Sequence, residues 1–528
     1  MERSALDSRG GAFPGSPASH ADPHHAQRAE AGPSLSLSCG RDNCRPSLEA
    51  DGSFRSEYSI ILTTFAVVSH TQTPVAVIGG GFSGTLTAIH LALRLPERPV
   101  ILFEESGEVG PGLAYRRDDP HALLNIPARR MSAYQDETDH FNKFARRVLG
   151  EHVTPDDFVP RRIYGDYIKH CLEETQKHCP NLRVDHRAVI DVQSNPGSSV
   201  AVLTLKDQTA LMCSRVVLAT GNQGSAFSGS IWAQHTLPAR KASTFDKVKP
   251  GEAVLVIGTG LTMIDAVLEL ERRGTPAAIH AISRNGLLPR PYENASPVLP
   301  PELDELPDSN LRKSVRLFRQ ALARHKAEGG DWRDLFAALR QATPSLWQEL
   351  SAKDRRKFLR FISPFWEVHR HQCAPATFHA FQNLIDEGKL DLKRGTIVSV
   401  ENKNGRLRLG LAPRNRAAVT RWLDADHIID ATGPARDITT IKHALIANLL
   451  RRGFIVPDEL RLGAEIHPDY RAIGRNGFPS EWLYVTGPML RARYFEATAV
   501  PELRLHTAAL AARVANDLEG SSKVALAV

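Results

Sequence analysis

Five short apolar runs, each followed closely by glycine, dominate the hydrophobic pattern of this chain. They read VAVIGGG, VVLATGN, VLVIGTG, IIDATGP and LYVTGPM, and they occupy residues 75–81, 216–222, 254–260, 428–434 and 483–489. Because the runs are continuously apolar and do not alternate, they are typical of strands buried on both faces of a parallel sheet. We therefore expect an α/β fold with doubly wound layers.

A different pattern covers residues 300–385. There, LRKSVRLFRQALARHKA and WRDLFAALRQA repeat apolar residues at spacings of three and four, which predicts amphipathic helices. Proline-rich residues 288–308 lead into this block, and we interpret them as a connector. Residues 499–518 are also amphipathic, with Pro501 in the first turn, where the missing N–H of proline costs nothing.

These patterns predict two Rossmann-like dinucleotide-binding domains and a helical insert. The first dinucleotide-binding domain is expected to be discontinuous, and the second is inserted into it. The insert is expected to cap the cleft and to determine which substrate enters. The predicted segments are 74–245 and 426–520 for the first domain, 246–300 and 385–425 for the second domain, and 300–385 for the insert.

Residues 1–73 differ from the rest of the chain. They are rich in Ser, Pro, Gly, His and Ala and show no apolar periodicity before Ile60, so we expect a disordered amino-terminal extension. The apolar run 60–68 is too short to span a bilayer and lies too far from the amino end to be a secretory signal. We expect no membrane partner.

Charge and cysteine content narrow the function classes further. The net charge is +7 and the sequence pI is about 9.1, but Lys and Arg are scattered among Asp and Glu, so we expect no nucleic-acid partner. The six cysteines form no CxxC motif, which indicates a reducing compartment and predicts a cytoplasmic protein. Cys39 and Cys44 precede the first glycine turn. The redox cysteine pair of a flavin reductase would follow that turn, so the position of these two cysteines does not suit a redox role.

The first glycine turn carries a complete GxGxxG spacing at Gly79, Gly81 and Gly84. The first glycine allows a tight turn, the second lets the backbone approach a pyrophosphate, and the third lets helix pack on strand. Phe82 and Ser83 would open that helix, whose amino end attracts phosphate. Glu104 ends the next apolar run, twenty residues after Gly84, where a carboxylate can accept hydrogen bonds from ribose hydroxyls. A glycine turn in an unrelated α/β protein is the alternative.

Further motifs follow in a fixed order. They are GPGLAY at 110–115, HALLNIPARRMSAYQD at 121–136, FVPRRIYGDY at 158–167, GTGLTMID at 258–265, FWEVHRHQCAP at 365–375 and FEATAVPELR at 495–504. On these motifs, residues 74 to about 511 resemble the two-dinucleotide-domain flavoproteins. More narrowly, the chain resembles the FAD/NAD(P)-binding proteins of the YdhS type, which include the HpyO-type flavin-dependent urate hydroxylase.

The resemblance implies FAD at the first turn and additional cofactor contacts. Gly110, Gly112 and the loop around Asn125 and Pro127 would approach the flavin ring. The backbone at Val189 would meet the adenine, and the glycine of the ATG run, Gly221, would also contact the cofactor. Relatives often have aspartate after the position of Gly487, whereas this chain has Pro488. Glu496 or a helix amino end would then replace that aspartate. Ordinary turn chemistry is the alternative for each of these loop residues.

The second glycine turn repeats Gly258 and Gly260, but Met263 takes the place of the third glycine. The apolar run that follows ends in Ser283 and Arg284, where an NAD site would have an acid. A hydroxyl and a guanidinium can bind a ribose 2′-phosphate that an acid would repel. We therefore expect NADPH, with NADH possible. A solvated surface arginine is the alternative interpretation of Arg284.

Two dinucleotides in one chain indicate hydride transfer from NAD(P)H to FAD. The chain offers no redox cysteine pair and no iron–sulfur motif to take the electrons onward. This favours O₂ as acceptor and a C4a-(hydro)peroxyflavin that hydroxylates a small polar or heterocyclic substrate. The Baeyer–Villiger fingerprint FxGxxxHxxxWP is absent between the two turns. An NAD(P)H-dependent reductase with another acceptor and a non-catalytic FAD-binding protein remain alternatives, and a homodimer is compatible with the sequence.

His369, Arg370 and His371 form the densest polar cluster in the insert. We predict that they contact the substrate or the nicotinamide and are the catalytic residues. Structural support is the alternative, and metal ligation would require the two histidines to share one face of a strand, with a third ligand that is not evident. We expect no metal site. Arg161 and Arg162 could bind an anion or form ordinary surface charge.

Overall fold

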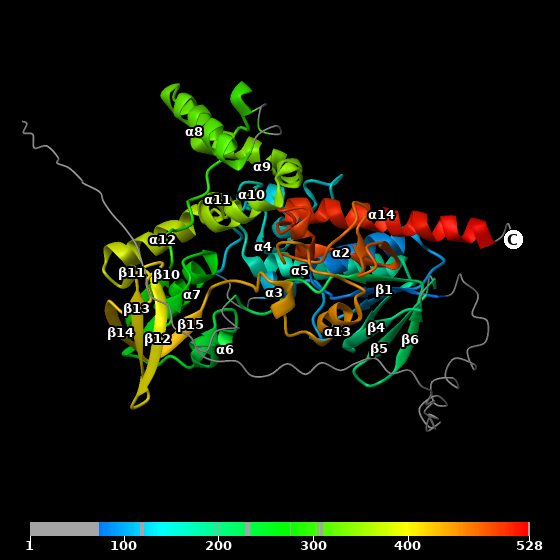
Figure 1. Ribbon diagram of the computed structural model, residues 1–528, viewed down its shortest axis with the longest axis horizontal. Coiled ribbons are helices and arrows are strands. Elements are labelled where there is room, and N and C mark those ends of the chain that lie inside the picture. Colours follow the sequence, from blue (N-terminus) through cyan, green and yellow to red (C-terminus); the bar gives the residue numbers. More distant parts are fainter. Residues whose placement is uncertain are drawn as a thin grey trace, which may run out of the picture. The chain divides into compact units, whose positions relative to one another are not determined.

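The computed structural model describes residues 73–116, 121–195, 197–198, 200–226, 233–274, 276–303, 306 and 310–525 (Figure 1). Residues 1–72 lie outside these ranges, so the expected amino-terminal extension, Cys39 and Cys44 fall outside the described residues.

Within the described ranges, the first sheet contains six strands in the order β16, β17, β7, β1, β2, β3. In that order they span Arg471–Ile473, Pro479–Val485, Arg215–Leu218, Val75–Ile78, Val100–Phe103 and Leu182–Asp185. Neighbouring strands run parallel, apart from the antiparallel pair β16 and β17. The strand β1, which precedes the first glycine turn, lies between β2 and β7 and is therefore central.

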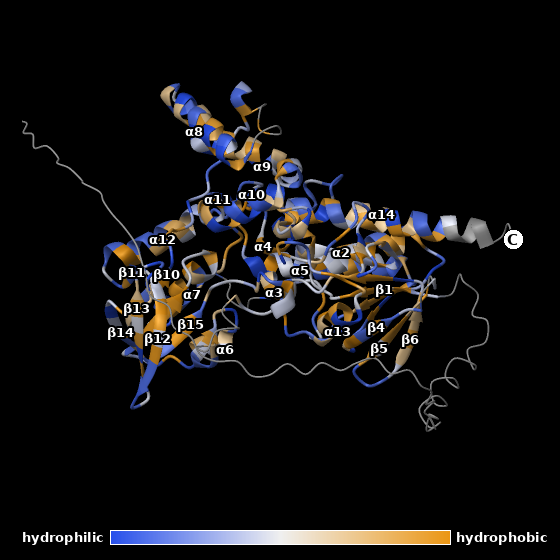
Figure 2. Ribbon diagram, in the orientation of Figure 1, coloured by the Kyte–Doolittle hydropathy of each residue, from blue (hydrophilic) through white to orange (hydrophobic). Residues whose placement is uncertain are grey.

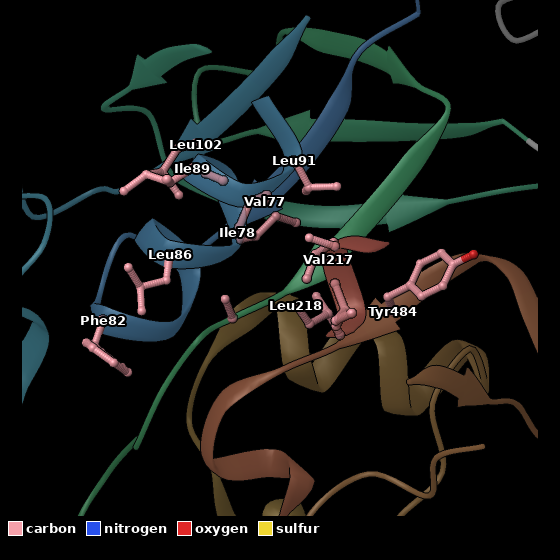
Figure 3. Close-up of a cluster of buried hydrophobic side chains, with 14 of the residues drawn as sticks. Val77, Ile78, Phe82, Leu86, Ile89, Leu91, Leu102, Val217, Leu218 and Tyr484 are labelled. Atoms are coloured by element: carbon pink, nitrogen blue, oxygen red, sulfur yellow. The ribbon is translucent and has the colours of Figure 1, made fainter. Parts of the chain in front are cut away.

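Helices bury this sheet, as its continuous apolar runs predict. Helix α2 (Phe82–Arg94) follows β1, and the carboxy-terminal helix α14 (Val500–Ala525) packs along it (Figure 1). Figure 3 shows part of the resulting core, to which the strands contribute Val77, Val217 and Tyr484 and helix α2 contributes Leu86. Fully burying a valine or leucine side chain contributes about 1.5–3 kcal/mol to the stability of the folded state.

Smaller elements complete the first domain. An antiparallel sheet of β4 (Val189–Gln193), β5 (Ala201–Leu205) and β6 (Ala210–Cys213) packs against helix α13 (Ala444–Arg452). The other helices of this domain are α3 (Gly112–Tyr115), α4 (His140–Leu149) and α5 (Arg161–His178).

The second sheet has the order β11, β10, β9, β15, β8, and its neighbouring strands are parallel. In that order the strands span Leu390–Arg394, Pro276–Ser283, Glu252–Ile257, His427–Asp430 and Thr236–Pro238. Helices α7 (Leu261–Arg272) and α12 (Pro375–Asp386) cover one face. The antiparallel strands β12 (Thr396–Lys403), β13 (Arg406–Ala412) and β14 (Arg421–Ala425) pack their apolar side chains on the other.

One expected boundary differs from the observed pairing. The sequence-based division assigned residues from 426 onward to the first domain, but β15 pairs with β9 and so belongs to the second sheet. Strand β8 also belongs there, although it lies before residue 246. The reason is that the runs VVLATGN and IIDATGP are alike, and local sequence does not reveal which central strand each one joins.

The chain passes between the two sheets twice, after β7 and after β15. The two passages are hydrogen-bonded to each other: the Ala226 N–H donates to the Gly433 carbonyl at 3.0 Å, and the Ala435 N–H donates to the Gln223 carbonyl at 3.2 Å. The Ser225 hydroxyl also donates to the Asp430 carboxylate. The two passages therefore form one paired connection.

The expected helical block contains α8 (Leu311–Ala327), α9 (Trp332–Glu349), α10 (Ala352–Lys357), a π-helical turn (Phe358–Ile362) and α11 (Ser363–Arg370). Figure 2 shows that α8 mixes hydrophobic and hydrophilic positions, whereas β1 is largely hydrophobic. Among the helices that the structure describes, none is both long and apolar enough to cross a membrane.

Candidate dinucleotide-binding sites

The first glycine turn is held by backbone contacts that exclude a side chain. Gly79 has φ +107°, and a Cβ atom there would lie 2.4 Å from the Ala219 carbonyl oxygen. A Cβ atom on Gly84 would lie 1.8 Å from the Gly79 carbonyl oxygen. Both distances are far below van der Waals contact, so these two glycines are required by the fold itself. The tight strand-turn-helix geometry follows from them.

Two other glycine segments approach the same turn. The Gly110 N–H donates to the Gly80 carbonyl at 2.7 Å, and a Cβ atom on Gly112 (φ +54°) would lie 3.1 Å from the Gly81 Cα. From the carboxy-terminal part of the chain, a Cβ atom on Gly487 (φ +76°) would lie 3.4 Å from the Ser83 Oγ. Segments from three parts of the sequence thus leave bare backbone around the start of α2.

The amino end of α2 suits a phosphate. Gly81 occupies the cap position, and no described side chain caps the helix, so its first N–H groups lack intrahelical acceptors and face outward. Ser83 is buried, and its carbonyl accepts a hydrogen bond from Thr87 Oγ1 at 2.7 Å. Phe82 is buried beside Tyr164, with ring centroids 6.1 Å apart. The glycine cradle and the uncapped helix end together fit the pyrophosphate of a dinucleotide.

Glu104 lies at the end of β2 beside this turn. Its Oε2 accepts a hydrogen bond from the Gly80 N–H at 2.8 Å, and its Oε1 accepts one from the Ser106 N–H at 2.9 Å. Because each carboxylate oxygen can accept a second hydrogen bond, the group remains available to ribose hydroxyls. The position agrees with the ribose role that the spacing suggests.

The structure also places the other residues predicted to contact FAD. Gly221 (φ +68°) follows β7, the parallel neighbour of β1. It therefore lies at the same edge of the sheet as the glycine turn, where the carboxyl ends of both strands meet. Asn125 is half-buried in a loop fixed by hydrogen bonds of Leu124 and Ala128. Val189 is the first residue of β4. Their contacts with a cofactor stay predictions.

The second glycine turn repeats the first in atomic detail. Gly258 has φ +108°, and its Cβ position would lie 2.4 Å from the carbonyl oxygen of Ala431, which follows β15. Gly260 occupies the cap position of α7, which no described side chain caps. A Cβ atom on Gly260 would meet nothing within 4 Å, so the fold itself does not require glycine there.

The residue at the third glycine position of the second turn is Met263, and Ser283 lies in the loop after the next strand. Met263 is fully buried in the core between α7 and the sheet. The Thr259 hydroxyl donates to the Leu287 carbonyl at 2.6 Å, and its oxygen lies 2.8 Å from Ser283 Oγ. Ser283 Oγ also accepts from the Gly286 N–H at 3.0 Å. This serine therefore orders the loop after β10, and Arg284 is exposed on that loop.

Two further arginines reach the same loop, and sequence reasoning missed them. Arg414 Nη1 donates to the side-chain oxygen of Asn285 at 2.6 Å. Arg394 ends β11 in register with Ser283, and a Cβ atom on Gly286 would lie 3.3 Å from its Cβ. No sequence signal revealed these two arginines, because residues 394 and 414 follow this loop by more than 100 positions and reach it only in the folded chain.

The predicted catalytic residues occupy the end of a helix. His369 and Arg370 are the last residues of α11, and His371 follows as its cap. The idea that the two histidines share a strand face is therefore wrong, since successive helical positions point in different directions. His369 faces the Trp332 ring, with centroids 4.7 Å apart, whereas His371 Nε2 lies 2.9 Å from a Glu367 carboxylate oxygen.

Arg370 is buried and fully used in structural contacts. Its Nε donates to the Glu496 carboxylate, and its Nη2 donates to Thr498 Oγ1 at 2.8 Å. Glu496 is 1% exposed and also accepts from Trp366 Nε1 at 3.1 Å and pairs with Arg340 Nε at 3.3 Å. These contacts join the helical insert to the carboxy-terminal segment. The expected roles of Arg370 at the substrate or nicotinamide and of Glu496 at the flavin stay predictions.

The pKa values of both Glu367 and His371 are lowered at this junction. Desolvation opposes ionisation of Glu367, but the hydrogen bond from His371 and the charges of Arg491 and Arg370 outweigh it and lower the pKa of the Glu367 carboxyl. Desolvation and the adjacent Arg370 charge lower the pKa of His371. Among the described residues, no group of three or more His, Cys, Asp or Glu side chains is arranged to hold a metal ion.

Two parallel sheets, each with a glycine turn at an uncapped helix end, define a two-dinucleotide-domain α/β protein. Residues 76–223 match a family described as FAD-NAD(P)-binding. The match confirms that this part of the chain is an FAD/NAD(P)-binding domain. No curated protein matches the chain.

Solved structures with a similar fold include ornithine hydroxylases and an L-lysine monooxygenase. The reduced form of ornithine hydroxylase from Pseudomonas aeruginosa aligns over 84% of this chain and 99% of its own, with 14% identity and a TM-score of 0.56. An ornithine N-hydroxylase from Kutzneria sp. 744, titled with reduced FAD, NADP⁺ and L-ornithine, covers the same shares at 14% identity and a TM-score of 0.55. L-lysine 6-monooxygenase from Pseudomonas syringae aligns over 85% and 99%, at 18% identity and a TM-score of 0.53. At these identities the likeness shows the fold.

Proposed function

We propose that this chain is an FAD- and NADPH-dependent oxidoreductase that acts as a monooxygenase on a small molecule. The observation that carries the proposal is the duplicated turn, in which Gly79 and Gly258 each pack 2.4 Å, at the Cβ position, from an alanine carbonyl. Each turn precedes an uncapped helix. Two such phosphate sites in one chain serve two dinucleotides better than one.

FAD at the first turn would supply the chemistry, because it accepts a hydride from NADPH and its reduced form passes electrons to O₂. The residues of this chain bind and orient. Gly81, Gly112 and Gly487 let the backbone approach the cofactor, while Glu104 holds its ribose. The resemblance to the urate hydroxylase type supports hydroxylation of a heterocyclic substrate as the finer form of the proposal.

The arginines around the second turn support NADPH as the hydride donor. Arg284, Arg394 and Arg414 converge on the loop after β10, and Ser283 orders that loop. Guanidinium groups bind phosphate in bidentate fashion, so a cluster of them favours a 2′-phosphorylated ribose over a free one. This extends the expectation drawn from Ser283 and Arg284 alone.

The described cysteines argue against the reductase alternative in its dithiol form. Cys171, Cys179, Cys213 and Cys373 are buried and free. Burial raises the pKa of the Cys171 thiol to about 11 and that of Cys213 and Cys373 to about 12. The thiolate is the reactive form, so none of these three thiols is suited to relay electrons. A cytoplasmic location, expected from the cysteine content, belongs to the same proposal.

The test is an anaerobic titration of the purified protein with NADPH and, separately, with NADH, followed by admission of air. We expect a flavin spectrum that NADPH bleaches faster than NADH and that air restores. A flavin that neither nicotinamide reduces would favour the non-catalytic FAD-binding alternative and overturn the proposal. Rapid reduction with air-insensitive reduced flavin would favour a reductase with another acceptor.

A further inference from the structure

The helical insert contains an apolar cavity of about 460 Å³. Helices α8, α9 and α11, the π-helical turn and Phe495 form its wall. Nine of the lining residues are Phe or Trp, among them Trp332, Trp347 and Trp366. Its size falls in the range of small-molecule sites, which are usually lined by aromatic and aliphatic side chains.

Helix α8 separates the apolar interior from a basic rim. Leu311, Val315, Phe318 and Leu322 repeat at spacings of three and four along the face that lines the cavity. One position further along, Arg312, Arg316 and Arg319 form the adjacent stripe. These arginines line a second hollow, which shares Leu311, Val315, Arg319, Phe361 and Ile362 with the cavity. The two hollows are therefore continuous past Arg319.

The rim carries positive charge that described residues do not neutralise. Arg312, Arg316 and Arg319 are exposed and have no hydrogen-bond or ion-pair partner among the residues that the structure describes. Lys357, on the same rim, pairs with Asp354 at 2.8 Å. The acidic residue on the cavity lining is Glu349, at the exposed end of α9. Anionic ligands are attracted to such a rim.

His369 is the polar group at the opposite wall. Its Nδ1 lies 2.7 Å from the Phe365 carbonyl, and since a carbonyl can only accept, Nδ1 carries the proton in that bond. The Trp332 and Phe336 rings flank the imidazole, with centroids 4.7 and 5.9 Å away. In the neutral ring, Nε2 is then an acceptor within an otherwise aromatic surface.

We propose that this cavity binds an amphipathic anion, a molecule with an apolar chain or ring that carries a carboxylate. The apolar part would occupy the aromatic interior, and the carboxylate would bind Arg319, with Arg312 and Arg316 beside it. Exposed Phe361 and Phe365, at 53% and 55%, flank the entrance. No residue of either glycine turn lines this cavity, whereas His369, which we predict to contact the substrate or the nicotinamide, does. The proposal is therefore tested by affinity and not by turnover.

The test is calorimetric titration of the full-length purified protein with sodium decanoate, and with decylamine as a probe of equal chain length and opposite charge. We expect one saturable decanoate site and binding of decylamine weaker by about tenfold or more. Arg319→Gln should weaken decanoate binding by about tenfold. Lys326→Gln is the matched control, since it removes the same charge from α8 at a residue that does not line the cavity, and it should leave the affinity unchanged.

A second variant tests the apolar part. Val315→Trp places a large ring where the two hollows meet and should abolish decanoate binding, while the melting temperature and flavin content report that the protein remains folded. Equal affinity for decanoate and decylamine, or an Arg319→Gln affinity equal to that of the parent, would overturn the proposal. Absence of saturable decanoate binding to the parent would overturn it as well, whatever the result of the nicotinamide titration.

Discussion

Arg161 Nη1 lies 3.1 Å from Asp265 Oδ2, and this ion pair joins helix α5 of the first domain to helix α7 of the second. Both side chains are largely buried, at 19% and 6% exposed. Arg161 also donates from Nε to the Leu123 carbonyl at 2.8 Å. The anion that the sequence suggested for Arg161 is therefore supplied by the protein itself, from the helix that follows the second glycine turn.

Asp265→Asn should slow reduction of the flavin by NADPH. The substitution removes the charge that holds α7 against α5, and small misplacements of reacting groups have large effects on rate. We expect a decrease of about tenfold in the stopped-flow reduction rate. Asp246→Asn is the control, because Asp246 pairs with Arg273 on the surface of the same domain. Equal rates for the two variants would remove the positioning role of Asp265.

Gly84→Ala and Gly260→Ala should separate structural from cofactor-binding glycines. Alanine at 84 would place a Cβ 1.8 Å from the Gly79 carbonyl oxygen, so we expect misfolding and loss of FAD. Alanine at 260 meets no protein atom within 4 Å, so the melting temperature should stay within about 1–2 °C. Its KM for NADPH should rise about tenfold because the methyl group obstructs the pyrophosphate. An unchanged KM would show that the second turn does not bind the coenzyme.

The arginine cluster predicts a change in coenzyme preference. Arg284→Ala and Arg414→Ala should each raise the KM for NADPH about tenfold and leave that for NADH nearly unchanged, because only NADPH has the 2′-phosphate. Arg416→Ala, an exposed arginine two residues beyond Arg414, serves as the control. If NADH and NADPH were affected equally, the cluster would not be a phosphate site.

Glu496→Gln should destabilise the protein. The carboxylate is buried between Arg370 and Arg340, and removing one charge of a buried network leaves the others uncompensated, at a cost of about 3–5 kcal/mol. Urea unfolding followed by circular dichroism measures this. Glu481→Gln, at an exposed position, should change the unfolding free energy by less than about 0.5 kcal/mol. A Glu496→Gln value in that range would contradict the structural role.

His506 should contribute to acid sensitivity. Burial lowers its pKa from 6.5 to about 4, so the folded state resists a proton that the unfolded state accepts. Between pH 6.5 and 4 the unfolded chain binds more protons than the folded chain. As the pH decreases over this interval, the free energy of unfolding therefore decreases by about 1–3 kcal/mol because of this group. The His506→Gln variant, which cannot titrate, should lose less stability than the parent over that interval. Parallel pH profiles of the unfolding free energy for the two proteins would contradict this assignment.

The sequence predicted those features that depend on neighbouring residues. The class of fold and the two glycine turns followed from apolar runs and from Gly79, Gly84 and Gly258, whose contacts are local or lie at strand ends. The membership of β15 in the second sheet did not, because that depends on which central strand it joins. Arg394 was missed for the same reason, since strand pairing brings it to Ser283. Arg414 follows β13 of a different sheet and reaches Asn285 through its side chain.

The contacts of the polar cluster could not be predicted for a different reason. His369, Arg370 and His371 are adjacent in the sequence, but burial determines their partners, and their contact with the substrate or the nicotinamide stays a prediction. The Arg370 guanidinium pairs with the carboxylate of Glu496, which lies 126 positions away in the sequence. No local sequence pattern predicts such a pair. The same insert contains an aromatic cavity whose lining comes from α8, α9 and α11 together, which periodicity alone shows only as three separate amphipathic helices.

The paired passages at Ala226 with Gly433 and at Gln223 with Ala435 have a mechanical consequence. Because the two crossings are hydrogen-bonded to each other, they resist being pulled apart or slid past one another. If the second domain moves relative to the first, both crossings must therefore bend together as one paired segment.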